Sequence, residues 1–218
     1  IETAISFRYL TNNKGYPIHR RWADAARRSL AEINLPLMNA LIPERLCIPD
    51  FLTPTPTQLE TSIEPELNRV LNTPHELVAK DLTFLCDLTG GSDIRSEFRA
   101  HPSDLLPALV GELRLYWEHV MAPAWPSLLA IVEGDILFRA RQLALEGNHR
   151  LLNDLSPQAS FDGSALRLLK PAEKSDMHHV IDSEGLHLVP SAFTFDHTMW
   201  QLVPQYKPMV IYGAHGVG

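Results

Sequence analysis

The sequence has few cysteines and no long apolar run. Cys47 and Cys86 are the two cysteines among 218 residues, and they form no C-x-x-C pair. Secreted disulfide scaffolds are much denser in cysteine, so we interpret both as reduced, core-packed thiols and expect a cytoplasmic protein. The longest apolar stretches, such as residues 35–42, are short and interrupted by proline, and no charged-then-apolar leader opens the chain, so no membrane association is expected.

An excess of basic residues is also absent. The chain has 19 Lys and Arg against 26 Asp and Glu, a formal net charge of −7. Domains that grip phosphates usually carry a basic excess, so these residues are not expected to bind nucleic acid by themselves. The arginine pairs at positions 20–21 and 27–28 are interpreted as a solvated, partly ion-paired helix surface rather than a phosphate-binding face.

Recognisable catalytic motifs are missing as well. There is no G-x-S-x-G elbow, P-loop, dinucleotide-binding G-x-G-x-x-G or aspartate-rich magnesium motif. Ten histidines invite a metal hypothesis, and the densest group is His178, His179, His187 and His197. Neighbouring residues on a strand point to opposite faces, and no H-E-x-x-H supports zinc, so we expect no metal, no cofactor and no enzyme activity.

Helical and strand-like patterns are present, and they are segregated along the chain. Residues 1–155 read mainly as helices, and residues 158–212 as short strands. This order predicts an α+β fold with a small, mostly antiparallel sheet near the C-terminus. We expect one effector or dimerisation domain over residues 1–218, with a helical part at 1–155 and a strand-rich part at 156–212.

Apolar periodicity and capping residues predict the helices. They are expected at residues 18–33, 61–71, 73–86, 103–121 and 126–146, with Thr61 and Thr73 as caps and Gly147 as a stop. The last two helices should form an antiparallel pair with Trp117 and Trp125 near the joint. Prolines make residues 46–57 an extended connector whose apolar residues lie against a core.

Runs of β-forming residues predict the strands. We expect them at residues 165–169, 179–181, 186–189, 192–195 and 209–212, with glycine-containing turns at 162–163 and 183–185. The glycine-rich residues 213–218 are interpreted as a flexible exit to a following domain.

A group of aromatic and charged residues on the two longest predicted helices is the candidate ligand pocket. It consists of Tyr116, Trp117, Trp125, Phe138 and Arg139. Ligand pockets are commonly apolar with a few polar anchors, although aromatics at such spacing are more often simply part of the core. The function could then be that of a stand-alone small-molecule-binding protein or an uncharacterised enzyme, and an interaction scaffold is a further alternative.

Five ordered segments resemble a bacterial domain family. They are residues 48–54 (IPDFLTP), 116–126 (YWE through PAWP), 136–141 (ILFRAR), 185–191 (GLHLVPS) and 210–218 (VIYGAHGVG). In this order they are similar to the uncharacterised domain that precedes an ArsR-type winged helix-turn-helix in many regulators.

The resemblance implies a non-catalytic, effector-sensing or dimerising domain of a transcription regulator. The winged helix would begin shortly after residue 218, which agrees with a chain that starts at Ile1 rather than Met and looks cut from something longer. Proteins of this type are generally dimers whose DNA affinity changes when an effector binds. The resemblance therefore implies a homodimer that reaches DNA through a domain outside these residues, and it assigns no effector and no functional residue.

Overall fold

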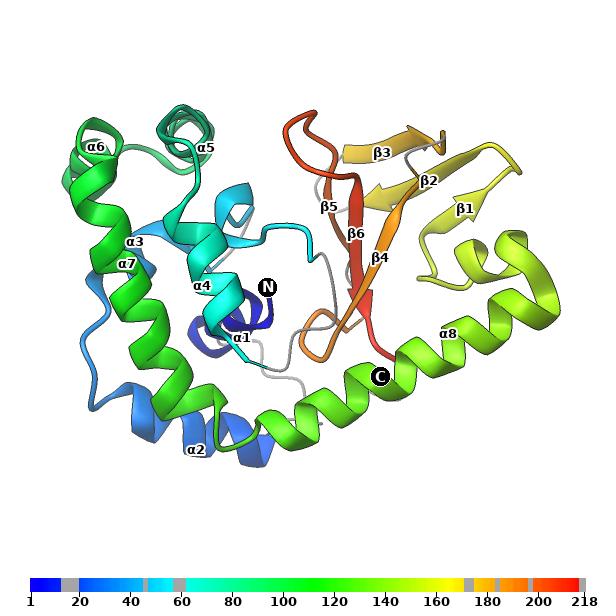
Figure 1. Cartoon of the computed structure of the whole chain (residues 1–218), viewed down its shortest axis with the longest axis horizontal. Coiled ribbons are helices and arrows are strands. Elements are labelled where there is room, and N and C mark those ends of the chain that lie inside the picture. Colours follow the sequence, from blue (N-terminus) through cyan, green and yellow to red (C-terminus); the bar gives the residue numbers. More distant parts are fainter. Residues whose placement is uncertain are drawn as a thin grey trace. The chain divides into compact units, whose positions relative to one another are not determined.

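The computed structural model describes residues 1–12, 20–44, 47–56, 62–170, 175–182, 185–195 and 198–215. The chain forms two compact units, Ile1–Trp125 and Pro126–Gly218 (Figure 1). Helices precede strands along the chain, and the predicted α+β class is confirmed. The boundary between the units lies before the long helix that was predicted to belong with the helical part, so this helix and the strands form the second unit. That residues 1–218 act as one domain stays a prediction.

The first unit is helical. Its elements are α1 (Glu2–Thr11), α2 (Arg20–Leu30), α3 (Pro36–Leu41), η2 (Asp50–Leu52), α4 (Glu64–Leu71), α5 (His75–Thr89), α6 (Asp93–Ala100), α7 (Pro102–Tyr116) and η3 (Trp117–Met121). Helix α7 contacts α3, α4, α5 and α6 and is the centre of this unit. Its inward side chains Leu106, Leu109 and Leu113 recur at three- and four-residue steps, as in any helix that buries one face.

Carboxylates of long helices hold the short elements of the first unit. Glu112 of α7 accepts hydrogen bonds from the backbone N–H groups of Leu37 (3.0 Å) and Met38 (2.8 Å), the first turn of α3. Asp81 of α5 accepts one from Phe51 N–H (2.9 Å) in η2. These N–H groups have no partner inside their own helices, and the remote carboxylates replace the local caps that the sequence does not supply.

Several sequence predictions for the first unit need correction. Helices α1, α3 and α6 were not predicted, and the proposed Thr73 cap is wrong, because Pro74 occupies the cap position and the Thr73 hydroxyl donates to Arg69 C=O (3.1 Å). Thr61 and residues 18–19 lie outside the described residues. The proline-rich connector contains η2, and its Phe51 and Leu52 are buried as expected.

Helix α8 (Trp125–Asn153) opens the second unit and bends sharply at one residue. Gly147 has φ 80° and ψ 175°, a conformation open in practice to glycine alone, after which the helix resumes for one and a half turns. The predicted end of a helix at Gly147 is therefore confirmed, and a second, short helical segment follows it after a bend that we call the Gly147 corner. Helix α7 belongs to the first unit and α8 to the second, and their predicted antiparallel pairing stays a prediction.

Two three-stranded sheets complete the second unit. Strands β1 (Ala159–Phe161), β2 (Ala165–Lys170) and β3 (Ser175–Val180) form an antiparallel sheet in the order β1-β2-β3. Strands β4 (His187–Ser191), β5 (Met199–Gln201) and β6 (Met209–Gly213) form the other in the order β4-β6-β5, with β4 parallel to β6. The predicted, mostly antiparallel pairing is confirmed, but the strands form two sheets rather than one. The strand predicted at residues 192–195 is absent.

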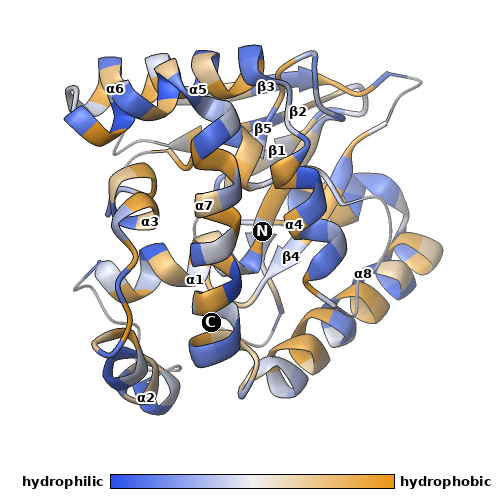
Figure 2. Cartoon of the chain, turned by 60° about the vertical axis from the view of Figure 1, so that its left-hand side comes forward, coloured by the Kyte–Doolittle hydropathy of each residue, from blue (hydrophilic) through white to orange (hydrophobic). Residues whose placement is uncertain are grey.

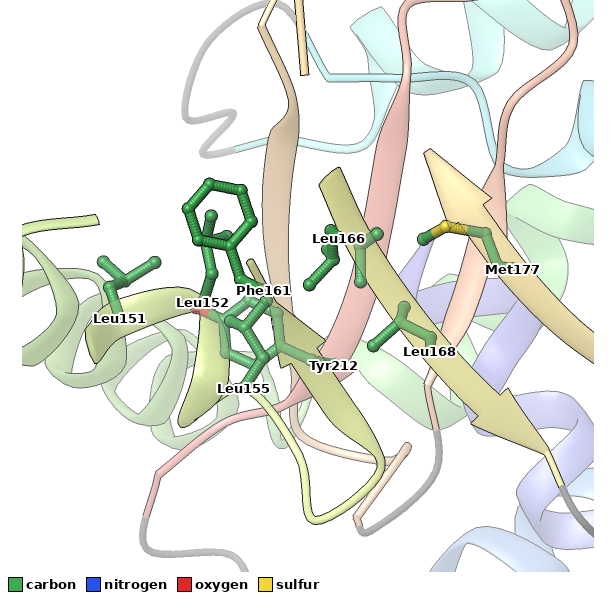
Figure 3. Packing of buried hydrophobic residues seen from close by; sticks show 9 residues of the cluster. Leu151, Leu152, Leu155, Phe161, Leu166, Leu168, Met177 and Tyr212 are labelled. Atoms are coloured by element: carbon green, nitrogen blue, oxygen red, sulfur yellow. The ribbon is translucent and has the colours of Figure 1, made fainter. Parts of the chain in front are cut away.

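Apolar side chains from the end of α8 and from both sheets form one cluster. Figure 3 shows Leu151, Leu152 and Leu155 of α8 and the residues after it beside Phe161, Leu166 and Leu168 of the first sheet, with Tyr212 of β6 among them. The corner at Gly147 turns these leucines toward the strands. Burial of this cluster is the main source of stability for the unit.

The start of the predicted flexible exit is ordered. Gly213 ends β6, Ala214 is buried, and its N–H donates to Ser191 C=O (2.9 Å). A Cβ on Gly213 would overlap the carbonyl of Phe195, so only glycine fits there. Residues 216–218 lie outside the described part.

No single helix in the described part of the chain is long and apolar enough to span a membrane. By length and composition alone, Pro102–Met121 and Trp125–Asn153 pass such a test when taken together across the break between them. Cys47 and Cys86 are free thiols and half-buried, and burial raises the pKa of Cys47.

Candidate functional site

The five residues of the predicted pocket are divided between the two units. Tyr116, Trp117 and Trp125 belong to the first unit, and Phe138 and Arg139 to the second. Neither unit gathers all five around a cavity of its own, so each subset is described where it lies.

Tyr116 is part of the core of the first unit. Its side chain is completely buried, its hydroxyl is 3.0 Å from Ser6 Oγ, and its ring meets Phe7 edge-on at 5.4 Å. Burial raises the pKa of Tyr116 well above its usual range, so the hydroxyl stays protonated. A neutral, satisfied and inaccessible phenol is a structural group.

Trp117 and Trp125 meet at the joint where the sequence placed them. Their rings make an edge contact at 4.9 Å. Both side chains are half-buried, and Trp125 Nε1 is a buried donor without a hydrogen-bond partner among the described residues. The two rings therefore pack on each other at the end of the first unit.

A small cavity lies elsewhere in the first unit. Its volume is about 20 Å³, and its lining includes Ala4, Leu52, Leu67, Leu113 and the carboxylate of Glu66. This space holds about one water molecule, far less than the several hundred cubic ångströms of a typical metabolite site.

Arg139 is the predicted residue with the richest environment, because it is buried against a buried carboxylate. Asp135, one turn earlier on α8, has a fully buried side chain, and its Oδ1 lies 3.7 Å from Arg139 Nε. The two residues stand four positions apart, acid before base, and form an ion pair on the inner face of the helix. Burying two charges is costly unless both are matched by further hydrogen bonds.

Strand β6 and the residue that follows it supply the other partners of Asp135. Tyr212 Oη donates to Asp135 Oδ2 (2.5 Å), and the backbone N–H of His215 donates to Oδ1 (2.7 Å). Burial, and then the bond to the Asp135 carboxylate, raises the pKa of Tyr212 well above its usual range, which keeps the hydroxyl a donor. The carboxylate thus holds the end of β6 against α8.

Gln142 and the chain beyond Gly147 supply the hydrogen-bond partners of the Arg139 guanidinium. Arg139 Nη1 donates to Gln142 Oε1 (2.9 Å), and Nη2 to Asp154 C=O (3.2 Å). Gln142 Nε2 in turn donates to Asp154 Oδ2 (2.7 Å). We call Asp135, Arg139, Gln142, Asp154, Tyr212 and the backbone of His215 the Asp135 cluster. It joins three parts of the second unit that are distant in sequence.

Aromatic rings cover the Asp135 cluster. The Arg139 guanidinium lies 5.4 Å from the Phe138 ring centroid and 5.3 Å from that of Tyr212. The exposed Phe138 ring stacks on the His215 imidazole at 4.3 Å, with 5° between their planes. Residue 215 is therefore held twice, by its backbone and by its side chain.

The hydrogen bonds of the Asp135 cluster hold strand β6 against helix α8. Its donors and acceptors are mutually satisfied, apart from Arg139 Nε, which is buried without a hydrogen bond among the described residues. No serine, threonine or cysteine takes part in it to act as a nucleophile beside a base. Breaking one contact would leave a buried charged group partly unmatched, so the contacts of the Asp135 cluster are expected to form and break together.

The histidine group singled out in the sequence is spread over different elements. His178 and His179 are neighbours on β3, one exposed and one half-buried, and His187 begins β4 of the other sheet. His197 lies outside the described residues. Within the described part, no three histidine, cysteine, aspartate or glutamate side chains gather closely enough to hold a metal ion.

Comparison with known proteins gives no relative. No protein-family model matches the chain, and neither the curated proteins nor the solved structures contain a significant match.

The spacing of Asp135 and Arg139, an acid four residues before a base, predicts their ion pair, but neither their burial nor their partner Tyr212 was predicted. A signal for the burial was present, because Leu128, Val132, Asp135, Arg139 and Gln142 recur at three- and four-residue steps on α8. Two opposite charges inside an otherwise buried stripe indicate an internal ion pair. Nothing in the local pattern indicates that residue 212 would meet them.

Proposed function

We propose that this chain is the N-terminal regulatory half of a bacterial ArsR-type winged helix-turn-helix transcription regulator. Its role is effector sensing or dimerisation, it is not catalytic, and the DNA-binding domain follows residue 218. The proposal rests on five ordered segments that resemble the domain preceding such winged helices.

The observation that supports it most directly is where three of these segments lie. Residues 136–141 supply Arg139, residues 185–191 form β4 beside β6, and residues 210–218 supply Tyr212 and His215. Two of the segments that carry the resemblance therefore meet at the Asp135 cluster, and a third lies beside β6. Because the cluster holds the last described residues, it is well positioned to transmit the conformation of the second unit to a domain that follows.

The mechanism proposed is linkage between two arrangements. An effector that binds one arrangement better than the other shifts the DNA affinity by no more than its differential affinity for the two. When the hydrogen bonds of the Asp135 cluster are formed, they fix the direction in which the chain leaves residue 215. When they are broken, the chain can leave residue 215 in other directions.

Two measurements test this proposal. The coding sequence beyond residue 218 should encode a winged helix with basic residues on its recognition helix, and a stop codon or an unrelated domain there would refute the proposal. In the complete regulator, Tyr212→Phe should change the Kd for duplex DNA at fixed salt. Asp162→Asn, which loosens the exposed turn before β2, is the matched control and should leave that Kd unchanged.

The alternative of a stand-alone small-molecule-binding protein or enzyme is favoured by no contact of the described residues. Tyr116 is sealed in a core, and the charged groups around Arg139 satisfy one another. Thermal-shift screening of the complete protein against metals and small metabolites tests it, because a ligand at 100 times its Kd stabilises by about 2.7 kcal/mol.

A further inference from the structure

Helix α8 has an outward, exposed face on which most residues are apolar or small. Its inward face is formed by Leu128, Val132, Asp135, Arg139 and Gln142, all buried. At 3.6 residues per turn the opposite face is centred on Leu137, whose side chain is 71% exposed. Figure 2 shows hydrophobic colour along much of this helix.

The outward face is apolar and small apart from two charges. Its exposed residues are Ala130, Glu133, Gly134, Leu137, Ala140, Arg141 and Ala144. The exposed Ile136, Phe138, Leu143 and Leu145 extend the apolar surface on both sides. A contiguous exposed apolar patch of this kind commonly marks a protein interface.

The residues of this face are arranged symmetrically about Leu137. Three positions before and after it stand the small residues Gly134 and Ala140, and seven positions away stand Ala130 and Ala144. Four positions away stand Glu133 and Arg141, which have opposite charges. A face with this pattern is complementary to itself when turned end to end.

We propose that α8 pairs antiparallel with α8 of a second copy of this chain, with the two-fold axis passing at Leu137. Each Glu133 then lies beside Arg141 of the other copy, and the alanines and glycine face one another. Such an interface is isologous and closes as a dimer.

The chemistry of the face supports this occupant over others. Glu133 and Arg141 have no ion-pair partner among the described residues, and about 12 Å of helix rise separates them, too far for pairing within one helix. Small residues let two helix axes approach to about 8 Å, near the lower limit for packed helices. A Cβ on Gly134 meets only open space, so a neighbouring helix has room there.

This inference deepens the proposed function and rests on it for its biological purpose, yet the two can fail separately. A monomer whose gene continues into a winged helix would overturn only the interface. A dimer through α8 whose gene ends or encodes something else would overturn only the regulatory role.

Charge reversal on the full chain tests the interface by sedimentation equilibrium over a concentration series. Glu133→Arg alone and Arg141→Glu alone each place like charges together at both ends of the pair, and each should weaken the dimer by about tenfold or more. The double variant should regain the wild-type dissociation constant.

Mixing the two single variants provides the sharper control. One copy then carries two basic residues and the other two acidic residues, so both pairs across the axis become attractive and a heterodimer should form at near wild-type strength. Both sites are exposed, so neither substitution disturbs folding, which circular dichroism verifies. A wild-type chain that stays monomeric at every attainable concentration, single variants that dimerise unchanged, or a mixture that fails to associate would each overturn the proposal.

Discussion

At the scale of single residues, the most consequential group is the buried carboxylate of Asp135. It receives a phenol, a backbone N–H and a guanidinium, drawn from β6, from residue 215 and from its own helix. Each donor reduces the cost of burying the charge. Removing one donor therefore costs more than the loss of an ordinary neutral hydrogen bond.

Tyr212 and Tyr116 are both buried, and removing their hydroxyls allows this difference to be measured. Tyr212→Phe removes a hydroxyl that donates to a carboxylate and should lower the free energy of unfolding by about 1.5–3 kcal/mol. Tyr116→Phe removes a hydroxyl paired with the neutral Ser6 and should cost about 0.5–1.5 kcal/mol. Urea unfolding of both variants gives the comparison, and an equal or smaller loss for Tyr212→Phe would contradict a stronger hydrogen bond to the Asp135 carboxylate.

Asp81 of the first unit should control part of the pH dependence of stability. Burial raises its pKa from 3.8 to about 6, in spite of the hydrogen bond from Phe51 N–H. The folded protein therefore holds a proton that the unfolded chain releases, so Asp81 stabilises most below about pH 4, and this contribution is lost as the pH rises through 6.

Asp81→Asn should remove this component, because an amide can accept the same N–H without ionising. The free energy of unfolding of the variant should fall less than that of the wild type between pH 4 and pH 6, as measured by urea unfolding at a series of pH values. Asp162→Asn is the control with the opposite sign, since backbone hydrogen bonds from Ala165 and Ser164 lower its pKa to about 2. Parallel profiles for Asp81→Asn and the wild type would refute the assignment.

At the scale of elements, the corner in α8 determines where the Asp135 cluster can form. Gly147 turns the chain so that Asp154 returns to Arg139 and Gln142, and it directs Leu151 and Leu152 into the strand cluster. A helix that continued straight would carry these residues away from their partners.

Gly147→Ala should therefore destabilise the second unit by about 1–3 kcal/mol, the cost of forcing a Cβ into a conformation reserved for glycine. Gly111→Ala is the matched control, since Gly111 lies within α7, has a helical backbone and leaves open space for a Cβ. That substitution should stabilise by up to about 1 kcal/mol. Thermal unfolding of both variants distinguishes a conformational requirement from a general effect of adding a methyl group.

Elements with strong periodicity were predictable from the sequence, and elements fixed by remote partners were not. The patterns placed α7 with η3, the start of α8, β2 and β6 within a few residues. Helix α3 was missed because its first turn is capped by Glu112, far away in sequence. The strand predicted at residues 192–195 is a bend, because Phe195 adopts φ 52° and approaches Gly213 closely.

The surroundings of the candidate pocket residues could not be predicted from the sequence for the same reason. Aromatic side chains in a helical stripe were recognisable, but their partition between Tyr116 in one core and Arg139 in another depends on which unit each helix joins. That choice is made by long-range contacts, which a local pattern does not contain.

At the scale of the whole molecule, the two units have separate cores, each built within its own stretch of chain. The first is centred on α7, and the second on the cluster of α8, β1 to β3 and β6. Units with their own cores open as separate cooperative bodies unless a large apolar interface couples them.

Hydrogen exchange measured by mass spectrometry should therefore report each hydroxyl deletion only within its own unit. Tyr212→Phe should speed exchange in peptides from residues 126–215 and leave residues 1–125 at wild-type rates, since the lost donor stabilises only the arrangement of β6 on α8. Tyr116→Phe should do the reverse, because its partner Ser6 and its ring neighbour Phe7 both belong to α1. Faster exchange throughout the chain in either variant would mean that the two units unfold as one body, and the Asp135 cluster would then have to be treated as part of a single cooperative core.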